Sequence, residues 1–177
     1  MATINTSGSG RPNKNEHYSD GSVIQYNVFP NAIESEKARL RKITDAYDII
    51  NKLDQKIDLQ GPCNNYFRTL PKGKTFRHFW RDNSIFINYS PSTAHGFYGA
   101  MHSNFKDISI TAWCLDNTNV WMIAATIVHE FAHIAGALGY PSHAAEKSAD
   151  MCGFKQQYNP NILGSIKRLG NYLEQIA

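Results

Sequence analysis

The sequence has few cysteines and little net charge, and each of these features excludes a class of protein. It contains no Cys-x-x-Cys pair, so a zinc ribbon held by cysteines is excluded. Three cysteines are an odd number and a poor disulfide framework, so we expect Cys63, Cys114 and Cys152 to be buried thiols in a reducing compartment. A formal charge of +3 is too small to argue for a nucleic-acid partner.

The sequence also lacks a long apolar run. A membrane helix needs about 18 or more apolar residues, and the most apolar stretch, 120–138, is interrupted by Thr126, His129, Glu130 and His133. We therefore expect no membrane span. Residues 1–21 are polar and lack the basic and apolar regions of a secretory signal peptide. The default expectation is a cytoplasmic protein, with export by a dedicated secretion system as the alternative.

What is present is the ordinary composition of a globular protein, with a length of about one domain. We expect a flexible polar tail over 1–21 and a single domain over 22–177. Apolar residues at helical spacing predict helices over 31–59, 120–137, 142–157 and 161–176. Alternating apolar residues predict strands over 22–30, 84–90 and 107–113. The expected fold class is α+β, with a small β-sheet.

Residues 62–83 mix aromatic residues with Lys and Arg. Such a mixture could form a basic aromatic surface for nucleic acid. We favour the simpler interpretation, in which the segment is a loop and strand region whose aromatic side chains belong to the core.

The segment that carries chemistry is HEFAH, residues 129–133, inside the expected helix 120–137. Four residues separate His129 from His133, so both imidazoles lean over one helix face and could hold one Zn²⁺. Glu130 is the next residue round the helix and could act as a general base on a metal-bound water. The flanking residues are apolar, and polar groups buried there are costly unless they have partners.

A second segment adds acidic residues at the same spacing. Glu146 and Asp150 share one face of the expected helix 142–157. Glu146 could be the third zinc ligand, with Asp150 or His143 as alternatives, and Asp150 could accept a hydrogen bond from a ligand histidine. An oxyanion donor is also needed. The candidates are Tyr140 and His143, or His95, Tyr98 and His102 from the segment 91–103.

Together, HEFAH and the later EKSAD (146–150) resemble the gluzincin metallopeptidases, whose pattern is HExxH and then ExxxD. The stretch EKSADMCG is also similar to a segment of the HtpX-like peptidases. The resemblance implies a compact zincin-like fold with an active-site helix. It also implies one Zn²⁺ held by His129, His133 and Glu146, with Glu130 as general base and Asp150 bonded to a ligand histidine.

This sequence departs from the families it resembles. The separation between His133 and Glu146 is shorter than gluzincins usually have, and the membrane helices of the HtpX-like group are missing. Zincins commonly bind substrate along an edge strand beside the active-site helix. Here the strand would be 84–90 or 107–113.

The expected function is zinc-dependent hydrolysis of peptide bonds in a protein or peptide substrate. A zincin with a polar tail and no signal is also typical of a secreted bacterial effector or toxin acting on a host or cell-wall target. Such a protein would have an immunity or inhibitor protein as a partner. The third alternative is a non-catalytic binding module stabilised by zinc, in which His143 closes the metal site as a fourth ligand.

Overall fold

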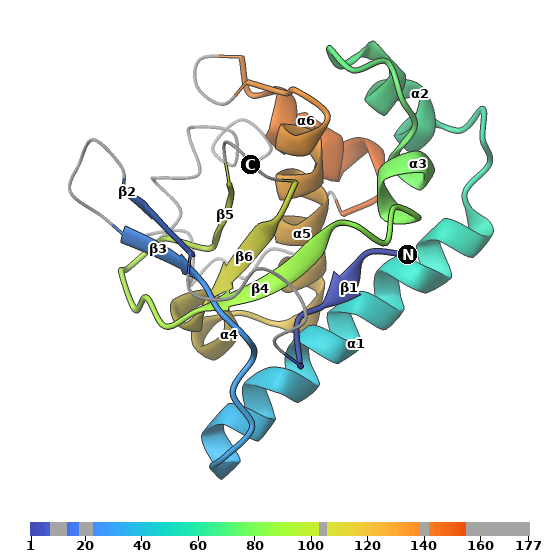
Figure 1. Cartoon of the computed structure of the whole chain (residues 1–177). Coiled ribbons are helices and arrows are strands. Elements are labelled where there is room, and N and C mark those ends of the chain that lie inside the picture. The colour runs from blue at the N-terminus through green and yellow to red at the C-terminus, as the bar shows by residue number, and fades with distance from the viewer. Residues whose placement is uncertain (8–13, 18–22, 103–105, 139–141, 155–177) are drawn as a thin grey trace.

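The structure is a computed structural model that describes residues 1–7, 14–17, 23–102, 106–138 and 142–154. A sheet of four strands has the order β1-β4-β6-β5 (Figure 1). Strands β1 and β6 both pair with β4 in parallel, and β5 pairs with β6 antiparallel. A separate antiparallel pair is formed by β2 and β3. The strands are β1 (Thr3–Ile4), β2 (Lys14–His17), β3 (Val23–Tyr26), β4 (Phe86–Ser90), β5 (Gly99–Met101) and β6 (Ile108–Thr111).

Helix α5 lies at the centre of the molecule, behind the sheet in Figure 1. It packs against the helices α1, α3 and α6 and against the strands β5 and β6. This arrangement confirms the predicted α+β class, with a small mixed sheet. The helices are α1 (Glu34–Lys56), α2 (Pro62–Thr69), α3 (Phe76–Trp80), α4 (Ala112–Asn117), α5 (Val120–Ile134) and α6 (Ala144–Met151).

The long helix α1 follows the predicted range closely. Its first turn is fixed by Glu36, whose carboxylate accepts hydrogen bonds from the backbone N–H groups of Ala32 and Ile33. The apolar stripe read from the sequence is the buried face, with Ile43 and Ile50 fully enclosed. Helix α1 therefore covers one side of α5.

The two predicted strands 84–90 and 107–113 are present as β4 and β6, but neither is an edge of the sheet. The edges are β1 and β5, so neither predicted strand can be the edge strand that was expected to bind substrate. Strand β6 ends earlier than predicted because the Thr111 hydroxyl accepts a hydrogen bond from the N–H of Cys114 at 3.1 Å and begins α4.

The segment 62–83 folds into two short helices, so the expected loop and strand region was wrong. Pro62 stands in the first turn of α2, and the Thr75 hydroxyl caps α3 by accepting from the N–H of His78 at 3.0 Å. The expected burial of the aromatic residues is confirmed. The buried rings are those of Phe67, Phe76, Phe79 and Trp80.

Other parts of the chain differ from the sequence predictions in smaller ways. The segment 1–21, expected as a flexible tail, contributes β1 and β2, and the expected connection 91–106 contains β5. The predicted helix 161–176 lies outside the described residues. Within the described ranges, none of the helices combines the length and apolarity that crossing a membrane requires.

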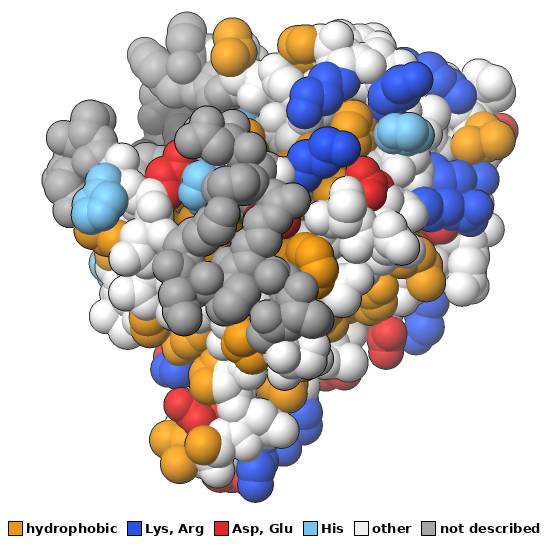
Figure 2. Space-filling view, viewed as in Figure 1, with side chains coloured by type: hydrophobic (Ala, Val, Ile, Leu, Met, Phe, Trp, Pro, Cys, Tyr) orange, Lys and Arg blue, Asp and Glu red, His pale blue; other side chains and the backbone are white. Residues whose placement is uncertain are grey.

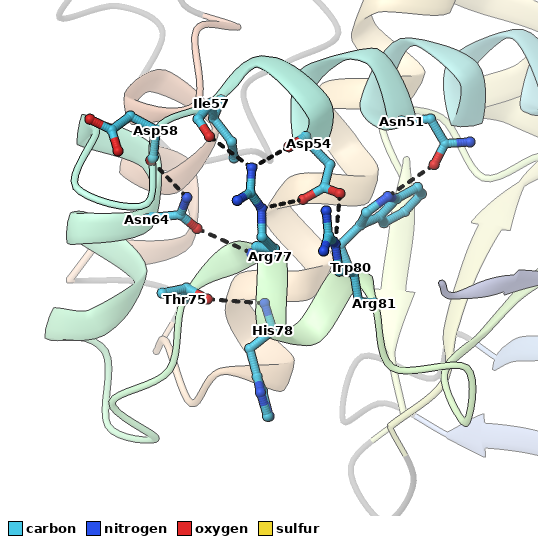
Figure 3. A network of polar contacts seen from close by, with 10 residues as sticks. All are labelled: Asn51, Asp54, Ile57, Asp58, Asn64, Thr75, Arg77, His78, Trp80 and Arg81. Atoms are coloured by element: carbon cyan, nitrogen blue, oxygen red, sulfur yellow. Dashed lines mark hydrogen bonds and ion pairs between the residues drawn. The ribbon is translucent and has the colours of Figure 1, made fainter.

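A polar network joins α1 to the α2–α3 segment (Figure 3). Asp54 of α1 is only 3% exposed, and its two carboxylate oxygens accept from Nε of Arg77 and Nε of Arg81, each at 3.0 Å. Arg77 also donates to the carbonyl of Ile57 at 2.8 Å. Because the buried carboxylate of Asp54 binds two arginines of the α3 segment, it holds α3 against the end of α1.

Replacing this carboxylate should destabilise the fold. We expect Asp54→Asn to lower the free energy of unfolding by about 2–5 kcal/mol, because one buried partner of a paired charge is removed. Asp45→Asn, on the exposed side of the same helix, should change it by less than about 0.5 kcal/mol. Denaturant unfolding of the two variants measures both values, and equal stability would contradict the role given to Asp54.

Candidate functional site

The HEFAH segment occupies the C-terminal half of α5. The helix begins at Asn119, whose side chain accepts from the N–H of Met122 at 2.9 Å. It ends before Gly136, which has a φ of 94° and lies so close to Pro71 that a Cβ would approach the proline at 2.9 Å. Most side chains of α5 are buried, so the polar residues of the motif stand on a helix enclosed by the core.

His129 and His133 meet directly on α5. Their rings lie 4.8 Å apart at 76°, and the two Nε2 atoms are separated by 3.1 Å. His133 Nδ1 lies 2.9 Å from the carbonyl oxygen of Ala137. Because a carbonyl can only accept, Nδ1 of His133 carries the hydrogen. In a neutral His133 the Nε2 atom is then an acceptor, and Nε2 of His129 donates to it.

Glu130 points into the core and is 4% exposed. Burial raises the pKa of its carboxyl to about 7, His133 offsets part of that rise, and the charge of Glu146 adds to it. Burial also lowers the pKa of His129 to about 3, with the neighbouring His133 as a further cause. The segment therefore keeps both an uncharged imidazole and a carboxyl that titrates close to neutral pH.

Glu146 comes to this region from α6 and is 8% exposed. Its Oε1 lies 3.8 Å from Nδ1 of His143, which begins α6 with a φ of 48°. Its Oε2 is buried and has no hydrogen-bond partner in the described part of the chain. Burial and the charge of Glu146 both raise the pKa of Tyr66, whose hydroxyl donates to the carbonyl of Ala144 at 3.0 Å.

The geometry of these side chains corrects the zinc prediction. Across the residues that the structure describes, no group of three or more His, Cys, Asp and Glu is arranged to hold a metal ion. The helical spacing does bring His129 and His133 together, but Glu146 makes its polar contact with His143 on its own helix. The predicted single Zn²⁺ is therefore wrong.

The remaining candidates are spread over the structure. Asp150 is half-buried on α6, and its predicted bond to a ligand histidine stays a prediction. Tyr140 lies outside the described residues. In the segment 91–103, His95 and Tyr98 pack their rings on Trp113, and His102 packs on Tyr26.

The sequence interpretation missed the disulfide between Cys63 and Cys152, which corrects the expectation of three free thiols. Cys63 lies in the first turn of α2 and Cys152 directly follows α6, so the bond fastens the end of α6 to α2. A separation of 89 residues gives no local signal for this pairing. Cys114 is the cysteine left over, and burial raises the pKa of its thiol to about 12.

No family model, no curated protein and no solved structure matches this chain.

Removing the disulfide should destabilise the protein. The double variant Cys63→Ser/Cys152→Ser is expected to lose about 2–5 kcal/mol of unfolding free energy, because a long loop is no longer closed in the unfolded chain. Thermal unfolding with and without reductant provides the control. The reductant should lower the Tm of the wild type and leave that of the double variant unchanged; an unchanged wild-type Tm would contradict the pairing.

Proposed function

We propose that the protein is a hydrolase that cleaves peptide bonds, with Glu130 as the general base. The observation that carries the proposal is the position of this carboxyl. It is enclosed in an apolar helix, 4% exposed, and flanked in sequence by an imidazole that contacts a second imidazole one turn away. Uncompensated polar groups in such a helix destabilise it, so this grouping is more typical of a working site than of a structural core.

The reaction assigned to Glu130 is a general-base hydrolysis. The carboxylate takes one proton from a water molecule as the water oxygen forms a bond to the carbonyl carbon of the substrate. It then returns that proton to the amide nitrogen as the carbon–nitrogen bond breaks, which leaves an acid and an amine as products. A pKa near 7 suits both steps, since such a group can accept and release a proton at neutral pH.

The two histidine rings that accompany this carboxyl on α5 are held in place by hydrogen bonds. The bond from His133 Nδ1 to the Ala137 carbonyl fixes the ring plane, and the contact between the Nε2 atoms holds His129 in turn. Glu146, from α6, adds a second buried carboxyl whose charge acts on Glu130. His143 is one of the predicted donors to the oxyanion, with Tyr140 and the residues of the segment 91–103 as the others, and its position next to Glu146 supports that role.

The disulfide favours one setting for this activity. Disulfides persist in oxidising environments and are rare in reducing cytoplasm. The Cys63–Cys152 bond therefore supports the alternative in which the chain is an exported effector or toxin, acting on a host protein or a peptide-containing cell-wall polymer, rather than the default cytoplasmic location. An immunity or inhibitor protein that covers the site would be its expected partner.

Glu130→Gln tests the proposal because it keeps the size and burial of the side chain but cannot take a proton. We expect it to lower the rate of peptide-bond cleavage by about 10²–10⁴-fold, measured by mass spectrometry of new termini in a mixture of unfolded proteins. Glu34→Gln, at an exposed position of α1, is the matched control and should keep wild-type cleavage. Cleavage by Glu130→Gln at the wild-type rate would contradict the proposal.

A further inference from the structure

Positive charge is concentrated in one short part of the chain. Residues 62–83 contain five Lys and Arg and one Asp, a net charge of +4, whereas the whole chain carries +3. The remaining residues therefore sum to about neutral. In Figure 2, Lys and Arg side chains gather on the upper right of the molecule, over α2 and α3. The positive net charge of the chain thus comes from this segment of the sequence.

The cations of this segment differ in whether they have acidic partners. Arg77 and Arg81 share Asp54 and belong to the network that holds α3. Lys72 and Lys74 are exposed in the turn between α2 and α3, and no carboxylate of a described residue lies within ion-pair distance of either. Their charges are therefore available to a ligand.

The turn that carries these lysines lies against the end of the α5 motif. The N–H of Lys72 donates to the carbonyl of Ala135 at 3.1 Å, two residues after His133. Pro71 fills the space beside Gly136. Because the backbone of the turn is bonded to the C-terminal end of α5, Lys72 is held next to the candidate site rather than on a distant surface.

A third lysine, Lys147, lies on α6. Lys147 directly follows Glu146, and its Nζ lies 5.6 Å from the centre of the Tyr66 ring on α2. The Tyr66 hydroxyl is bonded to the carbonyl of Ala144, so α2 and α6 are joined at this point. Lys147 is exposed and, like Lys72 and Lys74, has no described carboxylate as an ion-pair partner.

We propose that Lys72, Lys74 and Lys147 form a cationic rim that binds an acidic segment of the peptide substrate beside the bond that is cleaved. This inference rests on the proposed hydrolase function and specifies its substrate class. Two lysines on the turn that is bonded to the end of α5, and a third on α6, would attract a run of Asp or Glu and guide it to the site.

The same surface is poorly suited to nucleic acid. Recognition of single strands combines positive charge with aromatic rings on which bases stack. In the described segment 62–83 the Phe and Trp rings are buried, and Tyr66 is engaged by Ala144 and Lys147. The rim thus offers point charges without a stacking surface, which suits flexible carboxylate side chains.

The test measures binding apart from cleavage. The full chain carrying Glu130→Gln is titrated into two fluorescently labelled peptides of the same length, one with alternating Glu and one with Gln at those positions. We expect the acidic peptide to bind at least about tenfold more tightly at low salt, with the advantage largely lost near 0.3 M salt. Adding Lys72→Gln, Lys74→Gln and Lys147→Gln together should remove the preference.

A charge-matched control separates the effect of the rim lysines from the effect of losing three positive charges anywhere on the protein. Lys37→Gln, Lys52→Gln and Lys106→Gln, all at exposed positions elsewhere, should keep the preference for the acidic peptide. Equal binding of the two peptides, no binding of either, or an equal loss in both triple variants would overturn the rim. Tighter binding of inorganic polyphosphate or a DNA strand of the same charge would also overturn it.

The outcome for the rim is distinguishable from that for the proposed function. Wild-type protein incubated with the acidic peptide reports cleavage by mass spectrometry. Rim-dependent binding without cleavage would leave the rim supported and the hydrolase contradicted. Cleavage of both peptides at equal rates, with no preference in binding, would contradict the rim alone.

Discussion

The rest of the structure depends on the enclosure of α5 on nearly every side. Helices α1, α3 and α6 and strands β5 and β6 all pack against it, so whatever its sequence places inward is removed from water. For residues such as Ile127 and Phe131 this burial is the main source of stability. For Glu130 it has the opposite effect, because a carboxylate is driven toward its neutral form. The burial of α5 therefore makes the ionised form of Glu130 unfavourable.

The position of α6 adds to this effect. The disulfide to Cys63 holds its C-terminal end against α2, and the Tyr66 hydroxyl holds its first turn. Glu146 is thereby brought close enough for its charge to raise the pKa of Glu130. A negative charge close to a buried carboxyl raises the pKa of that carboxyl further toward neutral pH. The geometry of the site is thus maintained by contacts that lie outside it.

Strongly periodic elements were predictable from the sequence, and short or long-range features were not. The apolar spacing of α1 and of α5 located both helices, because this signal lies within a few residues. Helices α2 and α3 were missed, since five to eight residues are too few to show a period and their starts are set by Pro62 and Thr75.

In the candidate site, too, local features were predictable from the sequence and long-range features were not. Helical spacing brings His129 to His133 and so the contact between them could be foreseen. Whether Glu146 joins the two histidines could not be foreseen, because that depends on how α6 packs against α5, and the zinc prediction was wrong. The Cys63–Cys152 pairing has no local signal either. Sequence spacing thus indicates which residues share a helix face, whereas packing between helices decides which of them meet.

The central claim is that this fold keeps the Glu130 carboxyl buried in a state suited to proton transfer. The most direct measurement is a titration of the carboxyl carbons by NMR, with Glu130 assigned by comparison with Glu130→Gln. A midpoint near 7, well above the ordinary value of 4.5, is the predicted result. A midpoint at the ordinary value would mean that burial does not raise the pKa of this carboxyl, and would contradict the account of this site.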